Sequence, residues 1–348
     1  MRLQRETVEK REKQSDMNMI HSGHDYGISR RDFMAGAAAC VGAFAQGCSS
    51  LTSKDLSRYE DDLIDRCWMW GHETGQVDGL NNHWGLDPAE RYYHMVEGAK
   101  SFGLHNLNVI RWDLPDLAFR DTLRGMKRVT WPMSANTVEK HFTYAELGDY
   151  GFKAADESAN VTGFELDDYF KPKKKDVCWA DTPRGRVRVC PSVYPYSDLV
   201  ALRRRIDAYG RPLELRLVVY DQLFEQREDP RDLLPVIELA TTCTYWVWNG
   251  RNLSKLGELF RRYRELVPSK PTFLGVYLYD FGSHKAMSPE LLEGQLATGL
   301  ELFRRGEIEG FVFLCSSICN RRLPAVEIAR AWIAAHADEK WGTRRMHQ

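Results

Sequence analysis

The sequence predicts a (β/α)8 TIM barrel, a single α/β domain that follows an N-terminal signal segment. From residue 65 onward, short apolar runs alternate with amphipathic segments, and the alternation gives eight strand–helix pairs. Eight pairs in about 270 residues match such a barrel in number, length and order. The alternative, a doubly wound sheet, normally opens with a G-x-G-x-x-G turn, and residues 71–75 (Gly-His-Glu-Thr-Gly) lack that spacing.

The expected strands share short runs of aliphatic, β-branched and aromatic residues, which favour pleated and buried backbone. In chain order they are residues 67–73, 106–112, 128–132, 161–168, 213–221, 243–249, 272–280 and 310–317.

The expected helices share apolar residues at helical spacing. They are residues 87–102, 117–125, part of 137–157, 196–209, 231–240, 253–266, 289–305 and 324–335. Ser288 as N-cap and Pro289 in the first turn support the start of the seventh helix.

The N-terminal region resembles an export signal. Residues 29–34 (Ser-Arg-Arg-Asp-Phe-Met) form a twin-arginine block, and an Ala- and Gly-rich apolar stretch too short to span a bilayer follows. Residues 45–48 resemble a lipobox, so a lipid on Cys48 and ordinary cleavage after Ala45 are two alternatives. We expect a signal at 1–48, a linker at 49–65, the barrel at 66–338 and a tail at 339–348. The expected location is periplasmic, extracellular or lipid-anchored.

The charge balance points to no polyanionic partner. Without residues 1–48 the chain keeps 41 Lys and Arg against 43 Asp and Glu. Nucleic-acid-binding proteins usually carry a basic excess or a reading motif, and this chain has neither. We expect a carbohydrate partner, no nucleic acid, and membrane contact only through a lipid on Cys48. Beyond Cys48, Cys178 and Cys190 flank one loop, where a disulfide and free thiols are alternatives.

The ends of the expected strands carry the chemistry, because a (β/α)8 barrel places its active site there. Four of the eight strands end in carboxylates, and most others end in aromatic residues. This combination suits a sugar, whose C–H faces stack on aromatic rings while acids act at the glycosidic bond. The ring of strand-end residues comprises His72, Glu73, Arg111, Trp112, Trp131, Glu165, Asp167, Asp168, Asp221, Trp248, Asn249, Tyr279, Asp280, Ser316 and Ser317.

Within this ring, we expect Asp168 or Asp167 to pair with Asp280 as catalytic acids, with Asp221 assisting. Neighbours on a strand face opposite ways, so one of Asp167 and Asp168 faces the mouth, and Glu165 lies deeper on the face of Asp167. Asp221 and Asp280 have an alternative role as turn or cap residues. The expected substrate-binding residues are Glu165, His72, Glu73, Arg111, Trp131, Trp248, Asn249 and Tyr279.

Two further features bear on ligands. Residues 171–193 contain seven Lys and Arg but only two Asp, and this basic stretch suits a carboxylated or sulfated sugar; a solvated surface loop is the alternative. We expect neither a metal nor another cofactor, because no two histidines stand at helical ligand spacing with a carboxylate.

Four segments also carry a resemblance: residues 160–170 (Asn-Val-Thr-Gly-Phe-Glu-Leu-Asp-Asp-Tyr-Phe), 245–249, 275–282 and 309–314. They resemble a group of exported bacterial barrel proteins, mostly uncharacterised, that are similar in layout to glycoside hydrolases. The large retaining glycosidase clan carries a Glu preceded by Asn after strand four and a Glu at strand seven. Here those ends carry Asp167-Asp168 and Asp280. The resemblance implies a secreted carbohydrate-active enzyme.

Two other functions are alternatives. A metal-dependent sugar isomerase or epimerase would use Glu165, Asp167 and a histidine, although residues 315–318 supply no carboxylate to close such a site. A non-catalytic glycan-binding barrel would keep the fold without the chemistry.

Overall fold

The structure is a computed structural model that describes residues 62–72, 93–110, 117–133, 144–170, 178–182, 185–192 and 194–343. The chain divides into two compact units, Met1–Asp55 and Leu56–Gln348, and every described residue belongs to the second. The predicted signal segment and Cys48 therefore lie outside the described residues.

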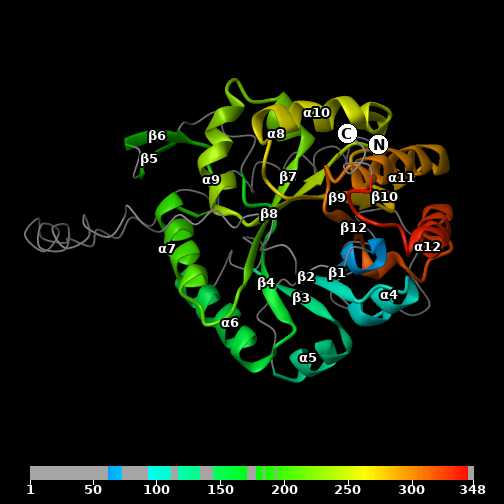
Figure 1. Cartoon of the computed structure of the whole chain (residues 1–348), viewed down its shortest axis with the longest axis horizontal. Helices are drawn as coiled ribbons and strands as arrows, with labels where there is room; N and C mark the ends of the chain where they lie inside the picture. Colours follow the sequence, from blue (N-terminus) through cyan, green and yellow to red (C-terminus); the bar gives the residue numbers. More distant parts are fainter. Residues whose placement is uncertain are drawn as a thin grey trace, which may run out of the picture. The chain divides into compact units, whose positions relative to one another are not determined.

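Eight parallel strands close into a barrel, which confirms the predicted fold class (Figure 1). The hydrogen-bonded order is β1-β12-β9-β8-β7-β4-β3-β2, so barrel strands that are consecutive along the chain lie side by side. The barrel strands are β1 (Cys67–His72), β2 (Asn106–Ile110), β3 (Arg128–Pro132), β4 (Val161–Leu166), β7 (Glu214–Tyr220), β8 (Thr242–Trp246), β9 (Thr272–Tyr277) and β12 (Gly310–Leu314).

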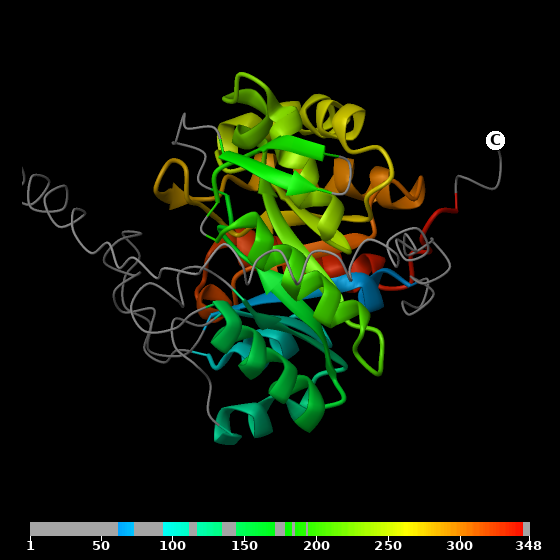
Figure 2. The same cartoon turned by 90° about the vertical axis from the view of Figure 1, so that its left-hand side faces the viewer.

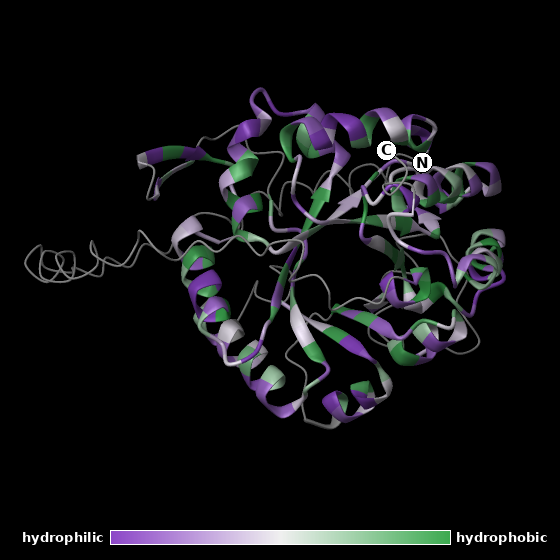
Figure 3. Ribbon diagram, viewed as in Figure 1, coloured by the Kyte–Doolittle hydropathy of each residue, from purple (hydrophilic) through white to green (hydrophobic). Residues whose placement is uncertain are grey.

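Helices surround the barrel on its outside, and their amphipathic faces are visible as alternating green and purple in Figure 3. They are α4 (Met95–Ser101), α5 (Leu117–Thr122), α6 (Tyr144–Glu157), α7 (Tyr196–Asp207), α8 (Asp221–Glu225), α9 (Leu234–Leu239), α10 (Leu256–Leu266), α11 (Pro289–Arg304) and α12 (Pro324–His336). Short 3-10 helices are η1 (Leu63–Arg66), η2 (Leu123–Gly125), η4 (Pro230–Leu233), η5 (Gly250–Lys255) and η6 (Ser316–Ile318).

The two faces of the strands differ sharply in polarity. The outward face is apolar: Phe164 of β4, for example, packs against Phe152 of α6 at 5.1 Å between ring centroids. The inward face carries Asn, Thr, Glu and Arg side chains between large aromatic rings. Room for one such ring depends on Gly275 of β9, where an added Cβ would lie 2.1 Å from Trp246 Cδ2. A glycine there lets the Trp246 indole fill the barrel.

Residues near both ends of the described chain contact one another and the barrel. The Leu63 N–H donates to the Glu339 carbonyl at 2.8 Å, and Asp62 forms a β-bridge and an ion pair with Lys340. The Trp341 indole N–H donates to the Ile308 carbonyl at 2.9 Å. Residues in the predicted linker (Asp62, Leu63) and in the predicted tail (Glu339, Lys340, Trp341) thus make ordered contacts in the second unit.

Two small hairpins were not predicted. Strands β5 (Cys178–Thr182) and β6 (Gly185–Val189) pair in the basic stretch after β4, and β10 (Tyr279–Asp280) pairs with β11 (Lys285–Ala286) after β9. The thiols of Cys178 and Cys190 are free. None of the helices in the described ranges combines the length and apolar character that crossing a bilayer requires.

Candidate active site

Two adjacent aspartates follow the end of β4. The Asp167 side chain is half-buried, whereas Asp168 is exposed. The Tyr220 hydroxyl, from the end of β7, donates a hydrogen bond to Asp168 Oδ1 at 2.8 Å. Asp168 also has a positive φ of 46°, a conformation that few residues other than glycine adopt, although Asp and Asn tolerate it best. Such strained backbone is often found at functional sites.

Asp167 holds its proton more tightly than an ordinary aspartate does. Burial, helped by the negative charges of Asp168 and then Glu165, raises the pKa of Asp167 well above its ordinary value. Adjacent carboxylates that repel one another in this way do not ionise together readily. Asp167 therefore favours the protonated form, and Asp168 Oδ1 accepts the hydrogen bond from Tyr220.

Aromatic rings gather beside these acids at the ends of β7, β8 and β9. Trp248 is 37% exposed and meets Tyr220 edge-on at 5.7 Å between centroids. It also meets Tyr277 edge-on at 6.1 Å and stacks on Phe281 at 6.2 Å. Burial and the charges of Asp168, Asp167 and Asp221 raise the pKa of Tyr277, so this phenol lies within electrostatic reach of all three acids and stays protonated.

Asp221 and Asp280 are buried and occupied with the backbone. Asp221 Oδ1 accepts the Trp248 N–H at 3.1 Å, and Asp280 Oδ1 accepts the Gly250 N–H at 3.0 Å. Asp280 Oδ1 also accepts the Ser283 N–H at 3.1 Å. The two carboxylates, from either side of β8, thus clamp the segment that carries Trp248. These contacts are of the kind that the turn-residue alternative predicts, and the Asp221 and Asp280 side chains are 1% and 2% exposed.

Glu165 lies inside the barrel below Asp167 and is fully buried. Its register partner on β7 is Arg216, whose Nε donates to Glu214 Oε2 at 2.9 Å and whose guanidinium lies 3.6 Å from the Trp68 ring centroid. Neither Glu165 oxygen accepts a hydrogen bond from a described residue within ordinary geometric limits. Burial raises the pKa of Glu165 to about 8, although the Arg216 charge opposes the shift.

The remaining predicted substrate-binding residues are spread over different surroundings. His72 ends β1, where burial lowers its pKa to about 4 and its backbone N–H donates to the Ser316 hydroxyl at 3.0 Å. Asn249 caps η5 by accepting the Arg251 N–H at 3.2 Å. Trp131 and Tyr279 are each 1% exposed, and Trp131 packs against Phe119 on the helix side of the barrel. Glu73 and Arg111 lie outside the described residues.

The structure therefore brings together Asp167, Asp168 and Trp248 from the predicted set, with Glu165 beneath and Asp221 behind. Tyr220 is the functional candidate that sequence reasoning missed. A signal for it existed: it closes the fifth strand, and period-two alternation puts it on the face of Arg216. Among the residues that the structure describes, no group of three or more His, Cys, Asp and Glu is placed to hold a metal ion.

Comparison with known proteins returns glycoside hydrolases among solved structures, at low similarity. One match is the GH2 β-galacturonidase from Eisenbergiella tayi bound to galacturonate, at 12% sequence identity and a TM-score of 0.47. The match covers 80% of this chain and 51% of that one. The Bacteroides uniformis β-glucuronidase matches at 9% identity and a TM-score of 0.42, over 71% of this chain and 30% of that one. A glycoside hydrolase family 5 enzyme from Prevotella bryantii in complex with a xyloglucan tetradecasaccharide matches at 14% identity and a TM-score of 0.42. This match covers 80% of this chain and 100% of that one.

The chain thus spans about half of the first of these proteins and less than a third of the second. No protein-family model and no curated protein matches the chain. At these identities the likeness concerns the fold alone, a closed barrel of eight parallel strands.

Proposed function

We propose that this protein is a glycoside hydrolase whose acid groups lie at the end of β4. The observation that carries the proposal is the pair Asp167 and Asp168, two neighbouring carboxyl groups in different surroundings beside an aromatic surface. A half-buried acid with a raised pKa is suited to donate a proton, and an exposed acid held by Tyr220 is suited to remain charged.

Each group then has a defined task. Asp167 donates its proton to the glycosidic oxygen as the bond from that oxygen to the anomeric carbon breaks. Asp168, as the carboxylate, stabilises the positive charge that develops at the anomeric carbon. A water molecule supplies the hydroxyl that bonds to this carbon, and its proton restores Asp167. Trp248 and Tyr220 present aromatic surface to the C–H faces of the sugar.

This assignment differs from the pair across the barrel that the sequence suggested. Asp280 and Asp221 use their oxygens to hold backbone N–H groups, so we propose that they position Trp248 and do not act on the substrate. Glu165 and the buried Arg216 support the strand that carries Asp167 from below.

Leaving-group dependence tests the role of Asp167. An Asp167→Asn variant should lose about 100- to 10,000-fold in kcat/KM on glycosides whose leaving group needs a proton. It should lose far less on a dinitrophenyl glycoside, whose leaving group departs without one. Equal losses on both substrates would remove Asp167 from the acid role. Wild-type protein that binds glycans but cleaves none would favour the glycan-binding alternative.

We further propose that the chain is exported through the twin-arginine pathway. The support is the block at residues 29–34, followed by the short apolar stretch that ends before Cys48. Replacing Arg30 and Arg31 by Lys should keep the protein in the cytosolic fraction of an expressing bacterium. Labelling with a palmitate analogue, compared between wild type and Cys48→Ala, tests lipidation; unchanged fractionation of the Lys variant would contradict export by this route.

A further inference from the structure

The hairpin of β5 and β6 leaves the barrel next to the acid pair. Phe170, two residues after Asp168, forms an antiparallel bridge with Ser192, and this bridge closes the base of the excursion that contains the hairpin. Figure 1 shows the two strands as a separate ribbon at the edge of the barrel unit, and in Figure 2 they lie in the foreground.

The hairpin is amphipathic. Ala180 and Val187, which face each other in register, pack against the hydrophobic core, and Val189 is buried. Period-two alternation sends the intervening residues to the opposite face. That second face carries two cross-strand pairs: Trp179 opposite Arg188, and Asp181 opposite Arg186.

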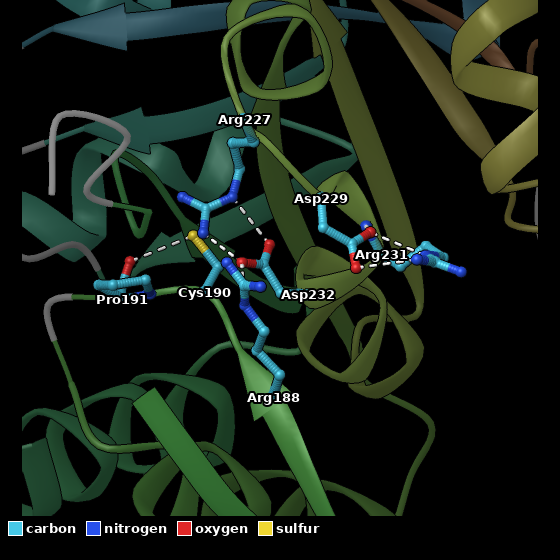
Figure 4. A network of polar contacts seen from close by, with 7 residues as sticks. All are labelled: Arg188, Cys190, Pro191, Arg227, Asp229, Arg231 and Asp232. Atoms are coloured by element: carbon cyan, nitrogen blue, oxygen red, sulfur yellow. Dashed lines mark hydrogen bonds and ion pairs between the residues drawn. The ribbon is translucent and has the colours of Figure 1, made fainter. Parts of the chain in front are cut away.

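The base of the hairpin is anchored to the segment that follows β7 (Figure 4). The Cys190 N–H donates to the Asp232 carbonyl at 2.8 Å. The buried Asp232 carboxylate accepts the Arg227 Nε at 2.8 Å, and a second Arg227 nitrogen also bonds to it. Arg188 reaches the same carboxylate from β6, at 3.7 Å. These contacts hold the hairpin in a defined orientation, and Arg188 is paired with the Asp232 carboxylate.

The outward face presents an aromatic ring beside a cation. Trp179 is 57% exposed, the largest value among the described large hydrophobic side chains that are exposed. The exposed Arg186 guanidinium lies 5.6 Å from the Trp179 ring centroid. Among the described residues, Arg186 forms no ion pair within 4 Å, even though Asp181 lies opposite it. An exposed indole offers apolar surface on which a sugar C–H face can stack.

We propose that Trp179 and Arg186 form an accessory binding site for an acidic polysaccharide, with the indole stacking on a sugar and the guanidinium pairing with a carboxylate or sulfate. The choice of polysaccharide rests on the proposed function of the barrel. Residues 171–193 contain seven Lys and Arg against two Asp, a charge balance that attracts anions.

A polysaccharide with one anionic group per sugar or per disaccharide suits this face better than a nucleic acid. Nucleic acid carries a charge on every phosphate and needs an extended basic surface. The whole chain has a formal net charge of −1. The described outward face carries Trp179, Asp181, Arg186 and Arg188, and Arg188 also lies 3.7 Å from the Asp232 carboxylate. Sugar C–H faces stack on indole, and Arg pairs with planar carboxylates or sulfates in a bidentate manner.

Affinity electrophoresis and calorimetry of the full chain test the site, with polygalacturonate, heparin, neutral xylan and an RNA oligonucleotide as probes. Wild type should bind an acidic polysaccharide more tightly than xylan or RNA. Trp179→Ala and Arg186→Gln should each weaken that binding about tenfold, and Trp179→Phe should restore part of it. Arg186→Gln should also reduce the dependence of binding on salt. Tyr150→Ala, which removes another exposed aromatic, from α6, should bind like wild type.

The outcomes separate this inference from the proposed function, because binding is measured without turnover. Binding that depends on Trp179 in a protein that cleaves no glycan would keep the accessory site and overturn the hydrolase. Three results would each overturn the site. They are a lack of binding to both polygalacturonate and heparin, unchanged binding in Trp179→Ala, and tighter binding of RNA than of either acidic polysaccharide. Cleavage of a small aryl glycoside should be unchanged in Trp179→Ala and Arg186→Gln.

Discussion

The Tyr220 hydroxyl donates to Asp168 Oδ1 at 2.8 Å, and this hydrogen bond joins the ends of two neighbouring barrel strands, β4 and β7. Burial and the Asp168 charge raise the pKa of Tyr220, so the phenol keeps its proton and remains a donor. Asp168 is exposed, and this hydrogen bond fixes the position of its Oδ1 relative to β7. The bond therefore orients the carboxylate that we assign to the charged role.

Removing that donor should lower activity without unfolding the protein. Tyr220→Phe should reduce kcat/KM by about 10- to 100-fold, the range expected for a hydrogen bond to a charged group. Asp168→Asn should reduce it further and, because Asn tolerates a positive φ, should keep the local backbone. Steady-state kinetics, with thermal unfolding as a check, measure both effects.

Tyr209→Phe is the matched control, because its hydroxyl makes the same kind of bond to the Asp156 carboxylate on the outer helices. Its kcat/KM should equal that of wild type. Equal losses in the two Phe variants would show that the Tyr220 hydroxyl has no special part in the reaction.

Asp280→Asn distinguishes the clamp from a catalytic acid. Asn keeps Oδ1, which accepts the N–H groups of Gly250 and Ser283, so we expect activity within a few-fold of wild type. Asp280→Ala removes both bonds and should lower the free energy of unfolding by about 1–3 kcal/mol per stranded group. Urea unfolding and kcat/KM are measured on both variants. A loss of activity in Asp280→Asn as large as that in Asp168→Asn would restore Asp280 as a catalytic partner.

Glu165→Gln should change how stability depends on pH. The pKa of Glu165 is about 8 in the folded protein against an ordinary value of 4.5, so the folded state holds an extra proton between these values. The stability is therefore fully present below about pH 4.5 and falls by up to about 1.4 kcal/mol per pH unit as the pH rises towards 8. Gln carries no titrating proton, so its variant should lack this contribution.

Urea unfolding at several pH values from 5 to 8 measures the slope, which is independent of any constant cost of placing an amide in the barrel. The exposed Glu293→Gln on α11 serves as control and should keep the wild-type slope. If Glu165→Gln keeps it as well, Glu165 is already ionised in the folded protein.

Trp248→Ala should weaken substrate binding more than it slows the chemical step. The ring is partly exposed and contacts Tyr220, Tyr277 and Phe281, so its removal takes away stacking surface and disturbs its neighbours. Stacking of this kind contributes about 0.5–1.5 kcal/mol, which corresponds to a rise in KM of up to about tenfold. Trp248→Phe should recover part of it. A fall in kcat at unchanged KM would argue against a binding platform.

The local pattern of the sequence was enough for the barrel itself. Apolar runs and amphipathic segments are short-range features, and their alternation predicted eight strands and the order in which they follow. It also placed Asp167 and Asp168 at the end of the fourth strand, because a strand end is marked by the residues beside it in the chain. The β5–β6 and β10–β11 hairpins were not predicted, because their strands are short or charged and lack an apolar run.

Only the tertiary structure decided which strand-end residues lie together. Asp168 and Tyr220 are 52 positions apart, and Gly250 and Asp280 are 30 apart. A carboxylate at a strand end can cap a backbone N–H or face a substrate, and the sequence around it looks the same in both cases. Barrel closure sets which donors lie within hydrogen-bonding distance, and those donors separate the exposed Asp168 from the clamping Asp221 and Asp280.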